Sequence, residues 1–255
     1  MRRLFVCEGP EDLAALRELF ILLYEATTVK STGVPLLAAG EARRQQLRVQ
    51  HRQIDLIASQ TGKSGLGDMA AQLLETAPRG DWATDPEAIE WICIVYDPDE
   101  PDENAYCTEL LAAIERRAQS WRIGLVSIGE WTAERGPGEL VRVRAVPWRA
   151  PGAVADRSAD KQSLDRLLCS VAARAFPEDA RIVERWLMEL NELGKHPGWK
   201  AALHLWCALV EQKASESNAA ARFLRQNSIC RPHVRGIVEE VSLLHDLTLL
   251  LGAPP

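Results

Sequence analysis

The chain has 255 residues, of which 47% are hydrophobic and 26% are charged, and its formal net charge is −6. This length and composition fit one large globular domain, or a core domain with a substantial extension. The acidic balance excludes a global basic surface for nucleic acid, but it is compatible with local basic patches and with an acidic metal site. No run of about 18 apolar residues occurs, so we expect no membrane span.

The cysteines and histidines show no pattern typical of a metal site. The six cysteines have no Cys-x-x-Cys spacing, and the five histidines are scattered along the chain, which argues against a zinc site. Several cysteines lie in apolar surroundings, as expected for reduced core residues of a cytoplasmic protein. Residues 1–4 lead directly into an apolar segment, so we expect no signal peptide.

The first predicted element is a short strand at residues 4–7, Leu-Phe-Val-Cys. An apolar run without alternation is typical of a strand that is buried on both faces of a parallel sheet. Glu8 and Gly9 follow it, and apolar residues at helical spacing then predict a helix over residues 10–25. Glu8 therefore stands at the carboxyl end of a strand, where open α/β sheets bind ligands.

The next segment is polar. We expect a loop at residues 27–33, and the Arg-rich residues 41–53 predict either a solvated helix or an irregular hairpin, with a nucleic-acid contact as the functional alternative. A strand at residues 54–59 follows. The sequence Gly62-Lys63-Ser64 is not a P-loop, because the position that needs the first glycine is Ile57. The segment predicts a turn before a helix at residues 67–76.

That turn has two interpretations. Its backbone N–H groups and Lys63 could face a phosphate, or its glycines could simply supply the positive φ that a tight turn needs. The most apolar strand follows at residues 89–96 and runs into Asp97-Pro98-Asp99. We then expect a helix at residues 105–118 and strands at residues 123–128 and 140–146.

The alternation of strands and helices predicts an α/β domain over residues 1–150, with a mainly parallel sheet flanked by helices. Residues 151–255 show helical periodicity, with breaks at Pro177, Pro197-Gly198 and Pro232. We expect this part to form an all-helical extension that packs on the core.

Acidic residues thus follow two strands, with Glu8 after the first and Asp97 and Asp99 after the most apolar one. Side chains two residues apart in extended backbone point the same way, so the two aspartates could share one hard cation. Mg²⁺ accepts a few carboxylates together with several waters, and it could hold a phosphate there. The alternative is an ordinary acidic turn, in which Asp99 caps the next helix.

The order of these motifs resembles the Toprim domain family, found in topoisomerases, bacterial primases and overcoming-lysogenization-type nucleases. The family has a hydrophobic strand ending in Glu-Gly and a later one ending in Asp-x-Asp, matched here by Glu8-Gly9 and Asp97-Pro98-Asp99. The small stand-alone Toprim proteins look most similar, because they continue Glu-Gly-x-x-Asp-Leu as residues 8–13 do. They also carry a Leu-Glu-Asp-Leu-Leu-like segment after the sheet, where this chain has Leu-Asp-Arg-Leu-Leu at residues 164–168.

The resemblance covers roughly residues 1–170 and implies a metal site of carboxylates. In that site Asp97 and Asp99 would bind Mg²⁺ (or Mn²⁺), and Glu8 would be a metal ligand or a general base. The further acids implied for a second metal position are Glu11, Asp12 and Asp165, of which Asp165 would replace a glutamate and come from the helical extension. Lys63 would support the phosphate or the leaving oxygen.

The function that the resemblance implies is Mg²⁺-dependent phosphodiester hydrolysis of DNA or RNA, as the effector nuclease of a phage-defence or repair assembly. A partner protein such as an ATPase would supply energy or target selection, because the chain has no P-loop of its own. The first alternative is a non-catalytic Toprim-like module whose helical extension binds a partner protein. The second is nucleotidyl transfer to a small substrate with the same metal. The oligomeric state is left open.

Overall fold

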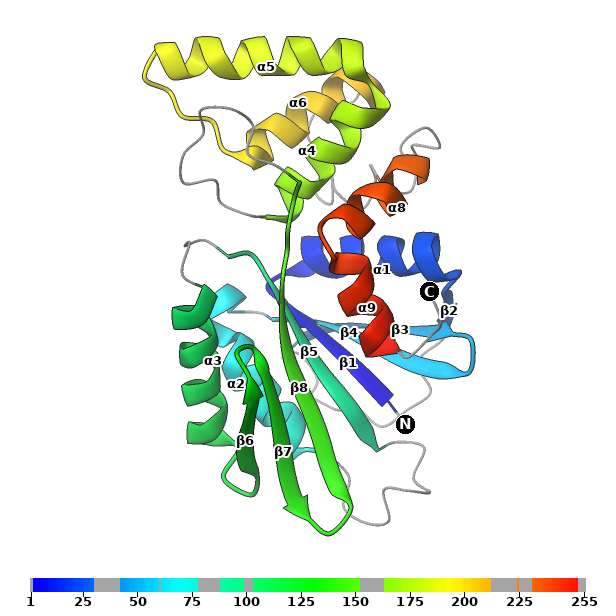
Figure 1. Ribbon diagram of the computed structural model, residues 1–255, viewed down its shortest axis with the longest axis vertical. Helices are drawn as coiled ribbons and strands as arrows, with labels where there is room; N and C mark the ends of the chain where they lie inside the picture. The colour runs from blue at the N-terminus through cyan, green and yellow to red at the C-terminus, as the bar shows by residue number, and fades with distance from the viewer. Residues whose placement is uncertain are drawn as a thin grey trace.

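The structure is a computed structural model that describes residues 2–29, 42–59, 61–77, 88–98, 103–151, 163–211, 224 and 231–251. Its centre is one eight-stranded sheet with the order β2-β3-β4-β1-β5-β8-β7-β6 (Figure 1). The strands are β1 (Arg2–Cys7), β2 (Thr27–Val29), β3 (Ala42–Val49), β4 (Arg52–Ser59), β5 (Ile89–Tyr96), β6 (Arg122–Ser127), β7 (Glu130–Gly136) and β8 (Glu139–Pro147).

The sheet is not mainly parallel, so that expectation was wrong. Three neighbouring pairs are parallel, and they join β4, β1, β5 and β8 into a parallel centre. Four pairs are antiparallel, and they add β3 and β2 at one edge and β7 and β6 at the other. The prediction of an α/β fold is confirmed, and the parallel centre contains the strands that carry the acidic motifs.

The central strand β1 is buried on both faces, as its apolar run predicts. Leu4 and Val6 pack into a cluster with helices α2 (Leu66–Glu75) and α3 (Glu103–Arg117). Their neighbours in the strand, Phe5 and Cys7, point to the other face and pack against α1. Because β1 lies between β4 and β5 in the sheet, its last residue is flanked by the ends of both strands.

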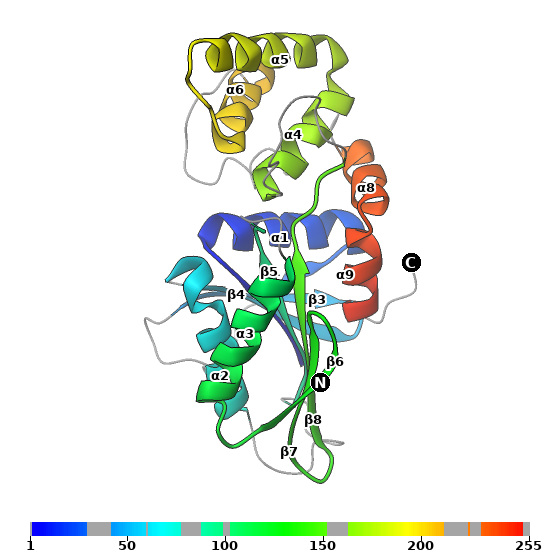
Figure 2. The same ribbon diagram turned by 60° about the vertical axis from the view of Figure 1, so that its left-hand side comes forward.

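Helices cover both faces of the sheet. Helix α1 (Pro10–Tyr24) begins directly after Gly9, with Pro10 at its first position, where proline needs no intrahelical hydrogen bond. It lies over β3 and β4. On the opposite face α2 packs closely on α3, and Gly67 permits this approach because a Cβ there would lie 2.7 Å from the Cβ of Ala113. Figure 2 shows α2 and α3 side by side.

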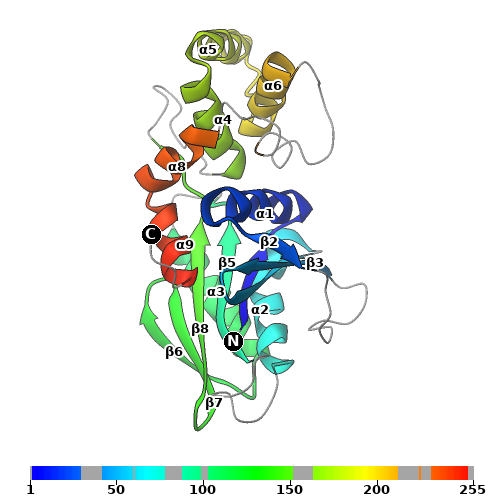
Figure 3. The same cartoon turned by 90° about the vertical axis from the view of Figure 1, so that its right-hand side faces the viewer.

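The described residues after position 163 form helices, and these share their core with one face of the sheet. A single apolar cluster runs from Phe5 and Trp91 in the sheet through Leu167 and Trp206 to Leu250. In Figures 1 and 3 helices α4 to α6 lie beyond the carboxyl ends of β5 and β8, while α8 and α9 return alongside the sheet. The helices are α4 (Leu164–Ala175), α5 (Pro177–Glu192), α6 (Trp199–Glu211), α8 (Arg231–Glu240) and α9 (Leu243–Leu251).

Two strands outside the parallel centre, β2 and β7, differ from the sequence expectations. Residues 27–29, expected in a loop, form β2, whereas the Arg-rich segment forms β3 in a hairpin with β4, one of the two structures predicted for it. Strand β7 was not predicted at all. Only Trp131 and Ala133 are apolar and buried, and they alternate with more polar neighbours. A pattern with two apolar residues does not distinguish this segment from a loop. These strands exist because pairing with a neighbour satisfies their backbone, which local sequence does not report.

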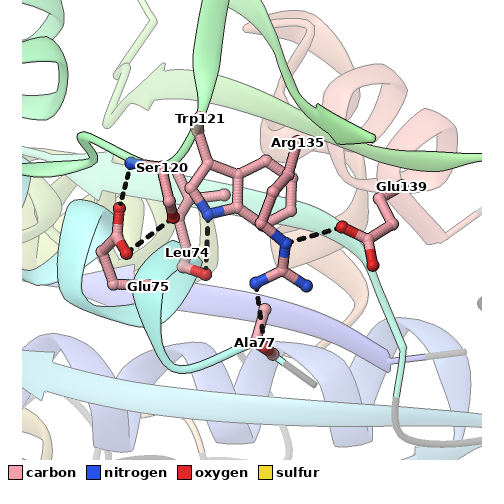
Figure 4. Close-up of polar contacts among 7 residues, drawn as sticks. All are labelled: Leu74, Glu75, Ala77, Ser120, Trp121, Arg135 and Glu139. Carbon is pink, nitrogen blue, oxygen red and sulfur yellow. Dashed lines mark hydrogen bonds and ion pairs between the residues drawn. The ribbon is translucent and has the colours of Figure 1, made fainter. Parts of the chain in front are cut away.

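A polar cluster closes the end of the sheet opposite to the carboxyl ends of its parallel strands (Figure 4). The indole N–H of Trp121 donates to the carbonyl of Leu74 at 2.9 Å, and the Arg135 guanidinium lies 4.6 Å from the Trp121 ring centroid. Arg135 also donates to the carbonyl of Ala77 at 3.3 Å and to Glu139 at 2.6 Å. The last turn of α2 is thereby joined to the β7–β8 hairpin.

Within the described ranges, none of the helices is both long enough and apolar enough to cross a membrane.

Candidate functional site

The predicted acidic residues Glu8 and Asp97 lie together at the carboxyl edge of the sheet. The backbone N–H of Asp97 donates a hydrogen bond of 2.8 Å to Oε1 of Glu8. This contact follows from the fold, because β1 and β5 are adjacent and parallel and each residue comes directly after its strand. The prediction that the two strand ends meet is therefore confirmed.

Asp12 contributes a third carboxylate from the first turn of α1. The indole N–H of Trp148 donates to Oδ1 of Asp12 at 3.2 Å, and the backbone N–H of Trp148 donates to the carbonyl of Tyr96 at 2.8 Å. Trp148 is fully buried and comes directly after β8. It therefore fixes the Asp12 carboxylate relative to the residue that precedes Asp97.

The amino end of α4 meets the same site. Ser163 caps this helix by accepting a hydrogen bond from the backbone N–H of Arg166 at 3.2 Å. The backbone N–H of Leu164, in the first turn, donates to Oδ1 of Asp97 at 3.0 Å. A helix N-terminus favours a negative charge, so α4 partly compensates the carboxylate that it contacts.

The electrostatics of the site are those of crowded acids. Burial, with the negative charges of Asp12, Glu8 and Asp165, raises the pKa of the Asp97 carboxyl to about 8, although the Leu164 hydrogen bond opposes this. Burial raises the pKa of Asp12 to about 6, against the hydrogen bond from Trp148. The fold thus holds together carboxylates whose ionised forms repel one another.

Asp165 and Glu11 lie on the side of this cluster that faces α6. Burial raises the pKa of Asp165, and Glu11 adds to the effect, while Lys200 and His204 oppose it. Lys200 Nζ lies 3.2 Å from Oε2 of Glu11, which joins α6 to the first turn of α1. The structure therefore brings five of the predicted site residues to one edge of the sheet: Glu8, Glu11, Asp12, Asp97 and Asp165.

Lys63 lies at the same edge but is directed at aromatic rings. Its Nζ is 4.5 Å from the ring centroid of Tyr106 and 5.9 Å from that of Tyr96, and the Tyr106 hydroxyl donates to its backbone carbonyl at 3.3 Å. The turn that carries Lys63 is a 3-10 helix, and Gly62 has a φ of 67°. The turn therefore has a structural need for glycine, as one of the two interpretations expected.

The predicted ligand Asp99 lies outside the described residues. Across the ranges that are described, no three side chains of His, Cys, Asp or Glu form a group arranged to hold a metal ion. The donor chemistry nevertheless suits a hard divalent cation, because Glu8, Asp12 and Asp97 offer carboxylate oxygens, the ligands that Mg²⁺ takes. Such a cation would also offset the burial and the mutual repulsion of the carboxylates, which together raise the pKa values of Asp97 and Asp12.

A cleft of about 410 Å³ lies beside this edge but does not contain the predicted site residues. It opens between the start of α3, the segment after β8 and the turn between α8 and α9. Arg149 and Glu103, which line it, form an ion pair of 2.8 Å. The remaining lining residues are Ala150, Pro151, Glu240, Val241 and Ser242.

Three residues of the site were not foreseen from the sequence: Trp148, Lys200 and His204. Trp148 gives no local signal, since any tryptophan after a strand could be a core residue. Lys200 and His204 give a weak sequence signal, because residues four apart lie on the same side of a helix. Nothing in the sequence indicates that this side of α6 faces the start of α1.

Comparisons with known proteins identify a similar fold but do not assign the chain to a family. No protein-family model matches the chain, and no curated protein matches it. The structure is similar to the crystal structure of hypothetical protein PH0156 from Pyrococcus horikoshii OT3, with a TM-score of 0.71 and 15% sequence identity. The match covers 98% of this chain and 99% of that one, so the fold is shared over both the sheet and the helices that follow it.

Proposed function

We propose that the chain is a Toprim-like, Mg²⁺-dependent nuclease that hydrolyses phosphodiester bonds at the edge formed by Glu8 and Asp97. The observation that carries this proposal is the hydrogen bond between these two residues, since it unites the Glu-Gly and Asp-x-Asp motifs at adjacent strand ends. The raised pKa values of Asp97 and Asp12 support it, because crowded carboxylates with perturbed pKa values are typical of functional sites.

In this proposal Glu8, Asp97 and Asp99 would hold Mg²⁺ or Mn²⁺, and Glu11, Asp12 and Asp165 would serve a second metal position. The metal would supply stabilisation of the charge that builds up on the phosphate oxygens. Alternatively, Glu8 would act as the general base, because it ends the central strand β1 at the acidic edge. Lys63 would act on the phosphate or the leaving oxygen only if its side chain leaves the rings of Tyr106 and Tyr96.

The test is cleavage of labelled single-stranded and duplex DNA and RNA by the purified chain with Mg²⁺ or Mn²⁺. We expect hydrolysis that is abolished by EDTA and by Glu8→Gln or Asp97→Asn. Glu178→Gln is the matched control, because Glu178 is an exposed acid on α5, remote from the acidic edge. Hydrolysis that survives both site variants, or its absence on every substrate with and without a partner ATPase, would contradict the proposal.

A second function, that of a non-catalytic module binding a partner protein, is favoured by exposed apolar side chains in the helical extension. Large apolar side chains on and just after α5 are exposed: Ile182 is 52% exposed, Met188 62% and Leu193 71%. Exposed apolar groups of this kind often mark a protein contact. In this case Glu8→Gln would leave partner capture unchanged, whereas Met188→Lys would abolish it.

A further inference from the structure

Two basic side chains on α6, Lys200 and His204, lie beside the acidic edge. Lys200 Nζ is 3.2 Å from Oε2 of Glu11, a residue 189 positions earlier in the chain. Both basic side chains act electrostatically on Asp165, in the first turn of α4. They therefore occupy the region where α6, α4 and α1 meet, next to the carboxylates of the proposed nuclease site.

Holding α6 in position does not require these two residues. Helix α6 packs through Ala202, Leu203, Trp206 and Cys207, which are buried in the main apolar cluster. The side chain of Lys200 is 61% exposed, and an ion pair as exposed as this one contributes little to stability. The pairing with Glu11 thus leaves the Lys200 ammonium accessible to a ligand.

His204 shows a second departure from a purely structural role. Its Nδ1 atom is buried and has no hydrogen-bond partner among the described residues. Buried polar atoms are nearly always satisfied in folded proteins, and an unsatisfied one requires an explanation. A histidine kept at this cost beside Lys200 and Asp165 is not accounted for by packing alone.

Charge gives the chemical class of that ligand. The chain carries a net charge of −6, and the acids Glu8, Asp12, Asp97 and Asp165 lie close enough to act on one another. A phosphodiester strand that approaches this edge is repelled unless cations offset the acids locally. Lys200 meets this need at the edge itself, with the His204 imidazole beside it on the same helix.

We propose that Lys200 and His204 bind the backbone phosphates of a nucleic-acid strand, so that the helical extension forms part of the substrate-binding surface. The inference rests on the proposed function, from which it takes nucleic acid as the ligand. It adds that recognition of the strand comes from α6 and not only from the sheet. Both residues act as binding groups and take no part in bond cleavage.

The experiment measures binding without catalysis. Fluorescence anisotropy of labelled single-stranded and duplex DNA and RNA is recorded in EDTA, where no metal is present, over a series of salt concentrations. The variants are Lys200→Ala, His204→Gln and the double variant. The matched control is the pair Lys195→Ala and His196→Gln, because it makes the same two substitutions at exposed residues that lie just before α6.

We expect the double variant to bind about tenfold more weakly, the effect typical of removing a charged hydrogen bond. The slope of log K against log salt should fall by about 0.7 to 0.9 for each phosphate that the variant no longer neutralises. Lys200→Arg should retain binding, and the control pair should match the wild type. Glu11→Gln should strengthen binding, because it removes a carboxylate that competes with the phosphate for Lys200.

This last variant separates the proposal from a structural role for the ion pair. If Lys200 only holds Glu11, then Glu11→Gln and Lys200→Ala will change binding in the same direction, and the inference is overturned. It is also overturned if the wild type binds no oligonucleotide, or if the control pair loses as much affinity as the double variant. Binding that depends on Lys200 in a protein that hydrolyses nothing would support the inference and refute the nuclease.

Discussion

Asp97 donates its backbone N–H to the carboxylate of Glu8 at 2.8 Å, across 89 positions of sequence. The same Asp97 accepts a hydrogen bond from Leu164 through its side chain. One residue thus links the end of β1 to the start of α4, so the sheet and the helical extension meet at the acidic edge. Any change at this point should affect both the fold and the proposed chemistry, and the two effects can be separated.

Glu8→Gln and Glu8→Ala separate the effect on the fold from the effect on the proposed chemistry. The Gln amide oxygen can still accept from Asp97, so we expect Glu8→Gln to keep the wild-type thermal midpoint. Glu8→Ala leaves that N–H without its acceptor and should lower the free energy of unfolding by about 1 to 3 kcal/mol. Both variants should reduce hydrolysis by about 10² to 10⁴-fold if Glu8 is the base. Thermal denaturation checks the effect on stability, and single-turnover cleavage checks the effect on hydrolysis. Full activity in Glu8→Gln would exclude Glu8 as the base.

Asp97 should make stability depend on pH. Its folded-state pKa of about 8 lies above the ordinary aspartate value, so the native state holds a proton that the unfolded state has lost. The contribution of Asp97 to stability is therefore fully present below pH about 4 and is lost as pH rises toward 8. Asp97→Asn removes this loss, so the variant should gain stability relative to the wild type between pH 4 and pH 8.

Divalent metal provides the complementary measurement. A cation that binds the ionised carboxylates stabilises the native wild type by about 2.7 kcal/mol at a concentration 100 times its Kd. We expect Mn²⁺ or Mg²⁺ to raise the midpoint of the wild type at pH 8 and to have much less effect on Asp97→Asn. Equal stabilisation of the two proteins would contradict a metal site at Asp97.

The strands that carry the site could be predicted because their pattern is local. Residues 4–7 and 89–96 are continuous apolar runs, and a strand buried on both faces needs such a run whatever its neighbours are. The acids that follow them were therefore placed correctly at one edge. Strand β7 could not be predicted in this way, because polar Glu130, Thr132 and Glu134 alternate with its two apolar residues and its pairing with β6 and β8 decides its conformation.

The position of Lys200 and His204 beside the acids could also not be predicted from the sequence, but for a different reason. Lys200 meets Glu11 only because α6 packs on the same apolar cluster as α1, through residues such as Trp206 and Leu16. The contact depends on how helices distant in sequence pack, and helical periodicity reports which face is apolar but not which partner covers it. The antiparallel pairing of the outer strands was missed for the same reason, because it depends on which strands become neighbours in the sheet.

Trp148→Phe tests the part that Asp12 plays. Burial raises the pKa of Asp12 to about 6 even though the hydrogen bond from Trp148 lowers it. Phe keeps the aromatic bulk but lacks the N–H, so the pKa of Asp12 should rise further. If ionised Asp12 is needed for hydrolysis, the acidic limb of the pH–rate profile should move to higher pH with little change in the maximal rate. If the acidic limb does not move, Asp12 has only a structural role in the first turn of α1.

Arg135→Met should reduce stability and leave the site unaffected. The guanidinium of Arg135 is 8% exposed, stacks on Trp121 and donates to Ala77 and Glu139, whereas Arg122 is 83% exposed in its ion pair with Glu134 (Figure 4). Removing these buried interactions should cost about 1 to 3 kcal/mol, while Arg122→Met should cost less than about 1 kcal/mol. At this chain length each kcal/mol lowers the midpoint by about 2 to 4 °C, which calorimetry resolves.

Metal binding and cleavage by the Arg135→Met protein, measured below its midpoint, should equal those of the wild type, because the Arg135 cluster lies at the end of the sheet opposite to Glu8 and Asp97. Equal destabilisation by the two arginine variants would show that the buried cluster contributes no more than an exposed pair. Lost cleavage in a folded Arg135→Met protein would instead couple the two ends of the sheet. The acidic edge would then depend on the β7–β8 hairpin, through the strand that continues from β8 to Trp148 and its hydrogen bond with Asp12.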